Sequence, residues 1–368
     1  MPKMRVLMII SSFYPLVGGA EKQALLLAKV LKTLGVEIAI LTRRYPGMAE
    51  RDKICGVNVI RAGIHHRNKA GSTFSFAAWL LYSLIHHDNY DIFHAHQPYS
   101  SAFLAGAMAK LTGKPAIAKI PGSASIATLS QLRVWAIDNL LDAIIVTNET
   151  SKNIAISRFR RSAVYVIPNG VVLAKNIDER YSALSDVVLS VGRLESVKNT
   201  QLLVKAWPRV HAVCPNARLI IIGSGSQLDT LRLNAMELGL QDCIDFIGQV
   251  DPFQVHTYYR HAGCFVSTSI SEGISNSLLE AIAAKVPVVA SRVSGNTDVI
   301  VDGETGLLFE PDDSCALAEA IISILRDKTK SKYLAAQAFE YAKKNFNISI
   351  VAQRYIDLYH DLLAKRIK

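Results

Sequence analysis

Short apolar runs alternate with helical segments along the whole chain. In the first half, apolar runs typical of buried strands cover residues 5–10, 37–42, 92–94, 116–120, 143–147 and 164–167. In the second half, the corresponding runs cover residues 187–191, 219–222, 244–247, 264–267 and 286–290. Strands that alternate with helices predict parallel sheets with right-handed crossovers, and two such sheets leave a cleft at their carboxyl edges. The pattern therefore predicts an α/β protein with two doubly wound domains.

The boundary between the domains is expected at the turn signal Pro168-Asn169-Gly170, which directly follows a strand. We therefore place the two domains at residues 1–170 and 171–347, with a last helix in residues 348–368. A chain of 368 residues is long enough for two hydrophobic cores, and 50% hydrophobic with 20% charged residues is typical of a globular protein.

Several features predict a cytoplasmic protein. The five cysteines are scattered and odd in number, so reduced thiols are expected. The longest nearly apolar run, residues 74–85, is shorter than the about 20 residues that span a bilayer. No signal peptide is expected, because Met1-Pro2-Lys3-Met4-Arg5 leads directly into a short strand.

The net charge of +10 is concentrated in the first half. Residues 1–170 hold 20 lysines and arginines against 9 acids (+11), whereas residues 171–368 hold 21 against 22 (−1). Such an excess suits nucleic acid, an anionic membrane or an anionic substrate, and the chain has no nucleic-acid-binding motif. We favour a membrane surface, since the cations from Arg61 to Lys69 precede a run of apolar and aromatic residues: Phe74, Phe76, Trp79, Leu80 and Tyr82. The alternative is an ordinary core helix after a solvated loop.

Two glutamates, Glu272 and Glu280, flank a strand-to-helix turn in the second half. We expect Glu272 in the loop at the carboxyl end of the strand, Ser275 or Asn276 at the N-cap, and Glu280 about one turn into the helix. The free amides of residues 274–277 would then form a positive helix start that suits a phosphate. The alternative is a helix start with an unrelated surface acid.

This segment resembles the Glu-x7-Glu signature of the family 4 retaining glycosyltransferases, which have the GT-B fold and use nucleotide sugars. The neighbouring sequences follow in the family's order: Ser267-x-x-x-Ser271-Glu272-Gly273, Leu279-Glu280-Ala281, Pro287-Val288-Val289-Ala290, Gly295 and Asp302-Gly303-x-Thr305-Gly306-Leu307-Leu308. The resemblance implies two Rossmann-like domains that face each other across a cleft. The N-terminal domain would bind the acceptor, the C-terminal domain the nucleotide sugar, and the last helix would cross back to the first domain. It also implies that Glu272 binds sugar hydroxyls and that Glu280 binds the ribose.

Two cations follow the strand at residues 187–191, in Gly192-Arg193-Leu194-x-x-x-Lys198. Positive groups at this place suit a diphosphate leaving group, and in the family the matching Arg and Lys bind the nucleotide's diphosphate. This stabilisation needs no metal, and the chain contains no Asp-x-Asp metal-nucleotide motif. We predict catalytic roles for Glu272, Arg193 and Lys198, with no metal and no other cofactor. The alternative is a pair of solvated basic residues.

The resemblance adds two glycine loops to the donor-binding residues. Gly223-Ser224-Gly225 matches the family's nucleoside-side loop, with a simple tight turn as the alternative. Gly18-Gly19 matches a loop whose backbone approaches the donor phosphate. The predicted donor-binding set is Gly18, Gly19, Arg193, Lys198, Gly223, Val250, Glu272, Gly273, Ile274, Ser275, Asn276 and Glu280.

The predicted acceptor-binding residues are Glu21, His96, Lys119 and Ser123. His94-Ala95-His96 resembles the family's His-x-His near the cleft, and we expect its two histidines to point to opposite faces of the strand. At most one of them would then face the cleft. Pro121 stands where many relatives carry a histidine, so Lys119 or Ser123 is the substitute candidate.

The resemblance implies a retaining glycosyltransferase, with a UDP-linked hexose or N-acetylhexosamine as the donor from family frequency. We expect a glycan acceptor, lipid-linked and used in cell-surface polysaccharide, lipopolysaccharide or glycolipid biosynthesis, and a peripheral position on the inner face of the cell membrane. The expected partners are the nucleotide sugar, the acceptor and an anionic membrane surface, and no nucleic acid. The alternatives are a catalytically silent sugar-nucleotide-binding protein, motivated by Pro121, and a GT-B sugar-nucleotide epimerase or phosphorylase.

Overall fold

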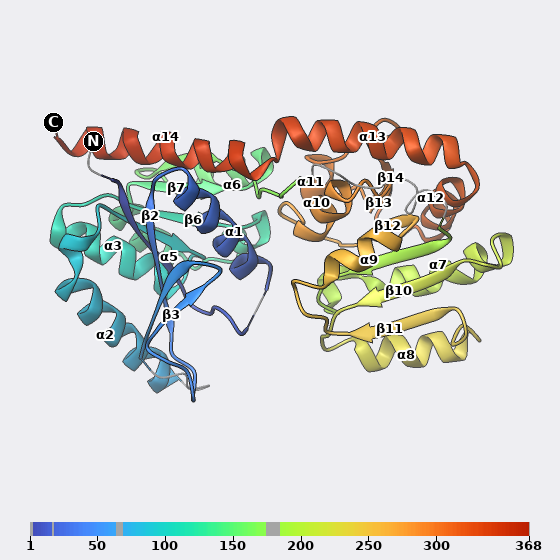
Figure 1. Cartoon of the computed structure of the whole chain (residues 1–368), viewed down its shortest axis with the longest axis horizontal. Coiled ribbons are helices and arrows are strands. Elements are labelled where there is room, and N and C mark those ends of the chain that lie inside the picture. The colour runs from blue at the N-terminus through green and yellow to red at the C-terminus, as the bar shows by residue number, and fades with distance from the viewer. Residues whose placement is uncertain (1–2, 17, 64–68, 174–184, 368) are drawn as a thin grey trace. The chain divides into compact units, whose positions relative to one another are not determined.

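The computed structural model describes residues 3–16, 18–63, 69–173 and 185–367 (Figure 1). The chain divides into two compact units. Unit 1 comprises Met1–Gly170 and Ile348–Lys368, and unit 2 comprises Val171–Asn347. None of the described helices combines the length and the hydropathy that a membrane-spanning helix requires.

Unit 1 is built on one eight-stranded sheet. Across the sheet the strands follow the order β3 (Arg51–Ile54), β4 (Val57–Ala62), β2 (Glu37–Arg43), β1 (Arg5–Ile10), β5 (Ile92–His96), β6 (Ala116–Ile120), β7 (Ala143–Val146) and β8 (Ala163–Val166). All neighbours pair in parallel except β3 and β4, which form an antiparallel hairpin at the edge. The winding direction reverses between β1 and β5, and such a switch point is where doubly wound sheets bind ligands.

Helices cover both faces of this sheet. Helices α1 (Gly19–Thr33) and α14 (Ile348–Ile367) pack together and share one core with Met8 and Ile117 (Figure 1). The opposite core holds side chains of α2 (Lys69–Ile85), α3 (Ser100–Thr112), α5 (Gln131–Leu140) and α6 (Glu149–Arg158). Two short helices complete the unit, η1 (His87–Asn89) and α4 (Ser123–Ala127).

Unit 2 is built on a six-stranded, all-parallel sheet. Its strands follow the order β11 (Ile244–Gly248), β10 (Arg218–Ile222), β9 (Val187–Val191), β12 (Cys264–Ser267), β13 (Val288–Ser291) and β14 (Leu307–Phe309). The switch point of this sheet therefore lies between β9 and β12. These strands are nearly continuous apolar runs because both faces of the sheet are covered.

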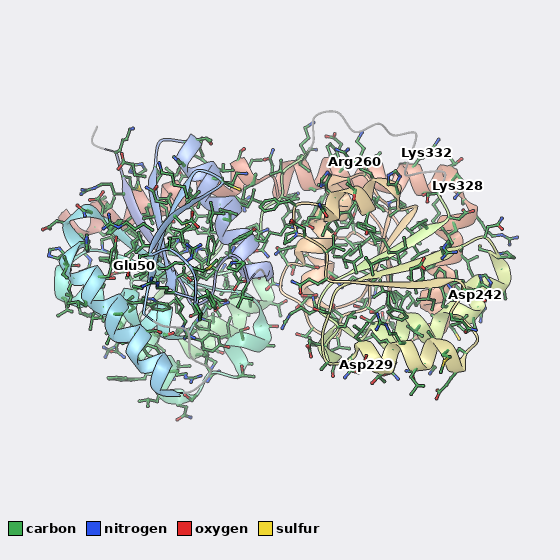
Figure 2. All side chains as sticks on the ribbon, turned by 60° about the horizontal axis from the view of Figure 1, so that its bottom comes forward. Glu50, Asp229, Asp242, Arg260, Lys328 and Lys332 are labelled. Atoms are coloured by element: carbon green, nitrogen blue, oxygen red, sulfur yellow. The ribbon has the colours of Figure 1, made fainter. Side chains whose placement is uncertain are left out.

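Two cores enclose the sheet of unit 2. One contains side chains of α7 (Thr200–Val213), α8 (Leu228–Glu237) and α12 (Ser314–Arg326), and the other contains side chains of α9 (Val255–His261), α10 (Asn276–Ala283) and α13 (Lys328–Asn345). The short helices η2 (Ser196–Lys198) and α11 (Ser294–Thr297) follow strand ends. Figure 2 shows the labelled side chains of Asp229 on α8 and Lys332 on α13, both of which are exposed.

The structure corrects the expected membrane contact at Arg61. Arg61 lies in β4 and is only 3% exposed, so it is not a surface cation. Its guanidinium donates to the Asp52 carboxylate at 3.0 Å and to two backbone carbonyls. Val57, Val59 and Arg61 alternate with more exposed residues, and the arginine is compensated across the β3–β4 hairpin.

Trp79 was also expected at a membrane surface, and this was wrong. The side chain of Trp79 is fully buried, and its indole donates to the carbonyls of Thr42 and Ala62 at 3.2 and 3.1 Å. Phe76, Leu80 and Tyr82 pack partly against the same core. This part of α2 is thus the core helix of the alternative interpretation. Residues 64–68 and the side chains of Lys69 and Phe74 lie outside the described part of the chain.

Candidate functional site

Polar and charged residues gather at the switch point of unit 2. The carboxyl ends of β9 and β12 line a small pocket with Gly192, Arg193, Lys198, Thr268, Ser269 and Ser277. Arg193 and Lys198 come from the loop after β9, and Ser269 and Glu272 come from the loop after β12. The fold therefore brings the three predicted catalytic residues to one edge of one sheet.

An ion pair joins the two loops. The Lys198 ammonium contacts the Glu272 carboxylate, and both side chains are mostly buried, with exposures of 23% and 13%. The Ser269 hydroxyl donates to the same carboxylate oxygen of Glu272 at 2.9 Å. Thr268 donates its hydroxyl to the backbone carbonyl of Lys198 at 2.9 Å, which ties the loops together a second time. Ion pairs at this burial depend on such additional hydrogen bonds.

Arg193 differs from Lys198 in having no such partner. Its side chain is exposed, and no carboxylate accepts from its guanidinium among the residues that the structure describes. A guanidinium with free donors at a strand end can take a phosphate in a bidentate manner. The site therefore presents one uncommitted cation beside one cation that is held by a carboxylate.

The helix after Glu272 begins as the sequence predicts. Ser275 is the N-cap of α10, and its hydroxyl accepts from the Leu278 amide at 3.4 Å. Asn276 is the first helical residue, and Glu280 lies one turn into the helix. Glu280 accepts from the Tyr259 hydroxyl at 3.3 Å, and burial, together with this carboxylate, raises the pKa of Tyr259. The two glutamates thus have different partners, which fits different roles.

Glycines allow the loops of the site to touch backbone to backbone. A Cβ on Gly223 would lie 1.8 Å from the Gly192 carbonyl oxygen, and Gly223 has φ +143°. A Cβ on Gly225 would meet the Leu194 backbone at 2.4 Å. The Gly-x-Gly loop therefore supports the Arg193 loop through close packing. Val250, also in the predicted donor set, follows β11 and packs partly against the core.

Gly295 plays the same part on the other side of the site. A Cβ at this position would lie 1.3 Å from the Gly273 carbonyl oxygen and 2.8 Å from that of Glu272. The Ser294 hydroxyl also donates to the Glu272 carbonyl at 3.5 Å. The start of α11 therefore braces the loop that carries Glu272. Ile274, next to this loop, is buried and packs in the core.

The predicted residues at the start of α1 lie in unit 1. Gly18 is the N-cap and Gly19 is the first helical residue. Glu21 accepts from the Gly18 amide at 2.9 Å and from the Ser12 hydroxyl at 2.6 Å. These two hydrogen bonds satisfy the Glu21 carboxylate and stabilise the start of the helix, which accounts for its buried position. Its predicted role in acceptor binding stays a prediction.

The His-x-His pair does not divide between two faces, so this expectation was wrong. The rings of His94 and His96 stack at 4.4 Å, because residues two apart in a strand point to the same face. Both are buried beneath α14, where His94 Nδ1 lies 2.8 Å from the Tyr359 hydroxyl. Burial lowers the pKa of His96 to about 3, with the Lys119 charge as a smaller cause.

The other predicted acceptor residues lie at the next strand. Lys119 is opposite His96 in the β5–β6 ladder, and Ser123 begins α4 after the exposed Pro121. Burial lowers the pKa of Lys119 to about 7. His96 and Lys119 therefore share one place at the carboxyl edge of unit 1, whereas the donor-type residues of unit 2 form a separate group.

Sequence reasoning missed three residues of the unit 2 site. Thr268 and Ser269 hold the backbone of Lys198 and the carboxylate of Glu272, and Tyr259 holds Glu280. Thr268 and Ser269 carried a signal, since they are polar and directly follow a buried strand. Tyr259 carried none, because its contact depends on how α9 packs beside α10.

Comparison with models of known protein families identifies the family of this chain. Residues 180–344 match the model of glycosyl transferases group 1, and residues 17–175 match the model of glycosyltransferase family 4. Together the two matches span nearly the whole chain. The chain belongs to glycosyltransferase family 4.

Individual relatives agree with this assignment. The chain is 29% identical to a phosphatidyl-myo-inositol mannosyltransferase of Mycobacterium leprae, over 97% of this chain and 96% of the relative. The structure resembles sucrose-phosphate synthase from Thermosynechococcus elongatus, with a TM-score of 0.83, 22% identity, and coverage of 99% and 100%. It also resembles Anabaena HepE in complex with UDP and glucose, with a TM-score of 0.79, 19% identity, and coverage of 97% and 100%. The fold is therefore GT-B, with two Rossmann-like units.

We expect Gly295→Ala to displace the loop that carries Glu272. The added methyl group cannot fit 1.3 Å from the Gly273 oxygen, so the Glu272 loop must move. Thermal unfolding should show a loss of at least about 1 kcal/mol of stability, and transfer activity should fall. Gly192→Ala is the matched control for stability, since its Cβ would meet only the end of Lys198, at 4.0 Å. Equal melting temperatures for both variants would contradict this account.

Proposed function

We propose that this family 4 glycosyltransferase transfers a sugar from a nucleotide diphosphate sugar with retention of anomeric configuration. The observation that carries the proposal is the ion pair of Lys198 and Glu272, with Arg193 beside it, at the switch point of unit 2. Doubly wound sheets bind nucleotides at this place. The catalytic roles of Glu272, Arg193 and Lys198 are part of the proposal.

Each charged group has a distinct task in the proposed reaction. As the glycosidic bond breaks, negative charge develops on the departing diphosphate. Arg193 and Lys198 stabilise that charge electrostatically, so no metal ion is needed. Lys198 has three N–H donors and can contact Glu272 and a phosphate oxygen together. Glu272 binds hydroxyls of the sugar, and the leaving diphosphate accepts the proton of the acceptor hydroxyl.

The remaining donor-binding residues surround this centre in unit 2. The start of α10, with Gly273, Ile274, Ser275 and Asn276, offers backbone amides to a phosphate. Glu280 binds the ribose from inside the helix. We propose UDP as the nucleotide, because HepE of the same fold was solved with UDP and glucose.

We propose a glycan or glycolipid as the acceptor, with His96, Lys119 and Ser123 in its site. The name of the mycobacterial relative specifies a phosphatidylinositol acceptor, which is both lipid-linked and anionic. The product would then belong to glycolipid or cell-surface polysaccharide synthesis.

A lipid-linked acceptor motivates a membrane contact, which we place on the exposed face of α2. Ala77, Leu81, Leu84 and Ile85 are exposed and follow helical spacing, and Leu81 and Ile85 are 60% and 67% exposed. Unit 1 holds 24 lysines and arginines against 11 acids (+13), whereas unit 2 holds 17 against 20 (−3). A cationic unit with an apolar helical stripe suits an anionic bilayer.

Lys198→Ala and Glu272→Ala should each lower kcat/KM for sugar transfer at least about 10²-fold, since each removes a group that acts at the developing charge. Product formation from a nucleotide sugar is measured with a metal chelator present throughout, where the wild type is expected to stay active. Lys205→Ala is the matched control, because Lys205 lies exposed on α7. Activity within a few-fold of wild type in either site variant would refute the assignment. Loss of wild-type activity in chelator, restored by metal, would refute metal independence.

Leu81→Asp with Ile85→Asp should lower binding to anionic liposomes at least about tenfold, because it puts charge on the apolar stripe. Liposome sedimentation at low salt measures the bound fraction, which should fall as salt rises. Leu233→Asp with Met236→Asp, two exposed apolar residues of α8, is the matched control. Equal binding to neutral and anionic liposomes, or none at low salt, would favour a soluble acceptor.

A further inference from the structure

A buried polar cluster lies at the carboxyl ends of β5 and β6 in unit 1. It consists of His94, His96 and Lys119 of the sheet, covered by Tyr355 and Tyr359 of α14. The Lys119 ammonium lies 5.8 Å from the centre of the Tyr355 ring, and the His94 ring lies 5.4 Å from it. β5 is one of the two strands at the switch point, and His96 is its last residue, so the cluster extends to the edge of the sheet at which doubly wound folds bind ligands.

The charge of Lys119 is uncompensated. Lys119 is only 6% exposed, and within the described part of the chain no carboxylate forms an ion pair with its ammonium. Buried lysines are normally paired, because a buried ammonium without a partner loses its hydration and gains no compensating interaction. In unit 2, by contrast, the Lys198 ammonium is paired with the Glu272 carboxylate.

Several buried polar atoms around Lys119 also lack a protein partner. Among the described residues, His94 Nε2, His96 Nε2 and the Tyr355 hydroxyl make no hydrogen bond. Buried polar atoms are almost always satisfied, so three unsatisfied ones in one cluster indicate a missing ligand.

The chemical groups of the cluster indicate the class of ligand that it would bind. The cluster holds one cation and several potential hydrogen-bond donors, and no acidic side chain of the described residues pairs with Lys119. This combination fits an oxyanion. We infer that Lys119, His96 and their buried neighbours form a subsite for an anionic group of the acceptor, a phosphate or a carboxylate. This inference rests on the proposed transferase function and names the class of acceptor that unit 1 takes.

The subsite should respond to pH through Lys119. The groups that face it are His94 and His96, whose pKa values burial lowers, and Tyr355 and Tyr359, whose pKa values burial raises. Burial lowers the pKa of Lys119 to about 7, so Lys119 is the member of the cluster that titrates near neutral pH. Anion affinity should therefore be high below pH 7 and should fall as the pH rises above it.

The experiment uses inorganic sulfate, whose charge does not change over this pH range. Thermal shift of the full chain at millimolar sulfate, with chloride at equal ionic strength as the reference, measures binding. Wild type should be stabilised at pH 6, and less so at pH 8.5. Lys119→Met should bind sulfate at least about tenfold more weakly, and Lys110→Met, an exposed lysine on α3, should bind it like wild type.

Stability without sulfate separates loss of binding from loss of folding. Lys119 binds its proton more weakly when folded than when unfolded, so its burial destabilises the fold fully below pH 7 and less as the pH rises toward 10. Lys119→Met should therefore melt at or above the temperature of wild type at pH 6, and this difference should shrink at high pH. A lower melting temperature at pH 6 would contradict the uncompensated charge.

Two results would overturn the inference: no sulfate effect on wild type, or an equal effect on Lys119→Met. Neither depends on sugar transfer, so the proposed function is judged separately by the Lys198 and Glu272 variants. Anionic vesicles then distinguish the source of the anion. Weaker vesicle binding by Lys119→Met would assign the subsite to a lipid headgroup, and unchanged vesicle binding with lost sulfate binding would assign it to a soluble phosphate or carboxylate.

Discussion

The ion pair between Lys198 and Glu272 is the interaction on which the candidate site of unit 2 depends. It links the loops after β9 and β12, the two strands at which the sheet of unit 2 reverses its winding. Burial makes each charge depend on the other, since either one alone would lose hydration without compensation. Close backbone packing at Gly223 and Gly295 then holds both loops in place. The hydroxyls of Thr268 and Ser269 add hydrogen bonds that link the same two loops.

Each unit has a lysine near the switch point of its sheet, but only the lysine of unit 2 is paired with a carboxylate among the described residues. In unit 2 the cation Lys198 is compensated by Glu272, and the cation Arg193 is exposed. In unit 1 the cation Lys119 is buried without a carboxylate among the described residues. The overall charges differ in the same sense, +13 against −3. The positive charge of unit 1 is consistent with the proposed anionic acceptor.

The parallel strand β14 (Leu307–Phe309), which is only three residues long, was missed from the sequence. Most of the other parallel strands could be predicted because they are buried on both faces and read as apolar runs. The β3–β4 hairpin could not, since its outer strand Arg51–Ile54 is mostly charged. Arg61 was misread for the same reason: its partner Asp52 lies across the hairpin, which composition does not reveal. The helix start at Ser275 followed from local capping rules. The environment of Lys119 could not be predicted from local rules. Its neighbour Tyr355 comes from a helix more than 200 residues later in the chain, and only tertiary packing brings the two together.

A crystal structure of the protein with bound UDP would show whether Arg193 and Lys198 hold the diphosphate. We expect a diphosphate at the carboxyl end of β9, with its oxygens within hydrogen-bond distance of both Arg193 and Lys198. The contact between Lys198 and Glu272 should be retained. A diphosphate bound elsewhere on unit 2, with Arg193 still free and Lys198 contacting only Glu272, would contradict this expectation.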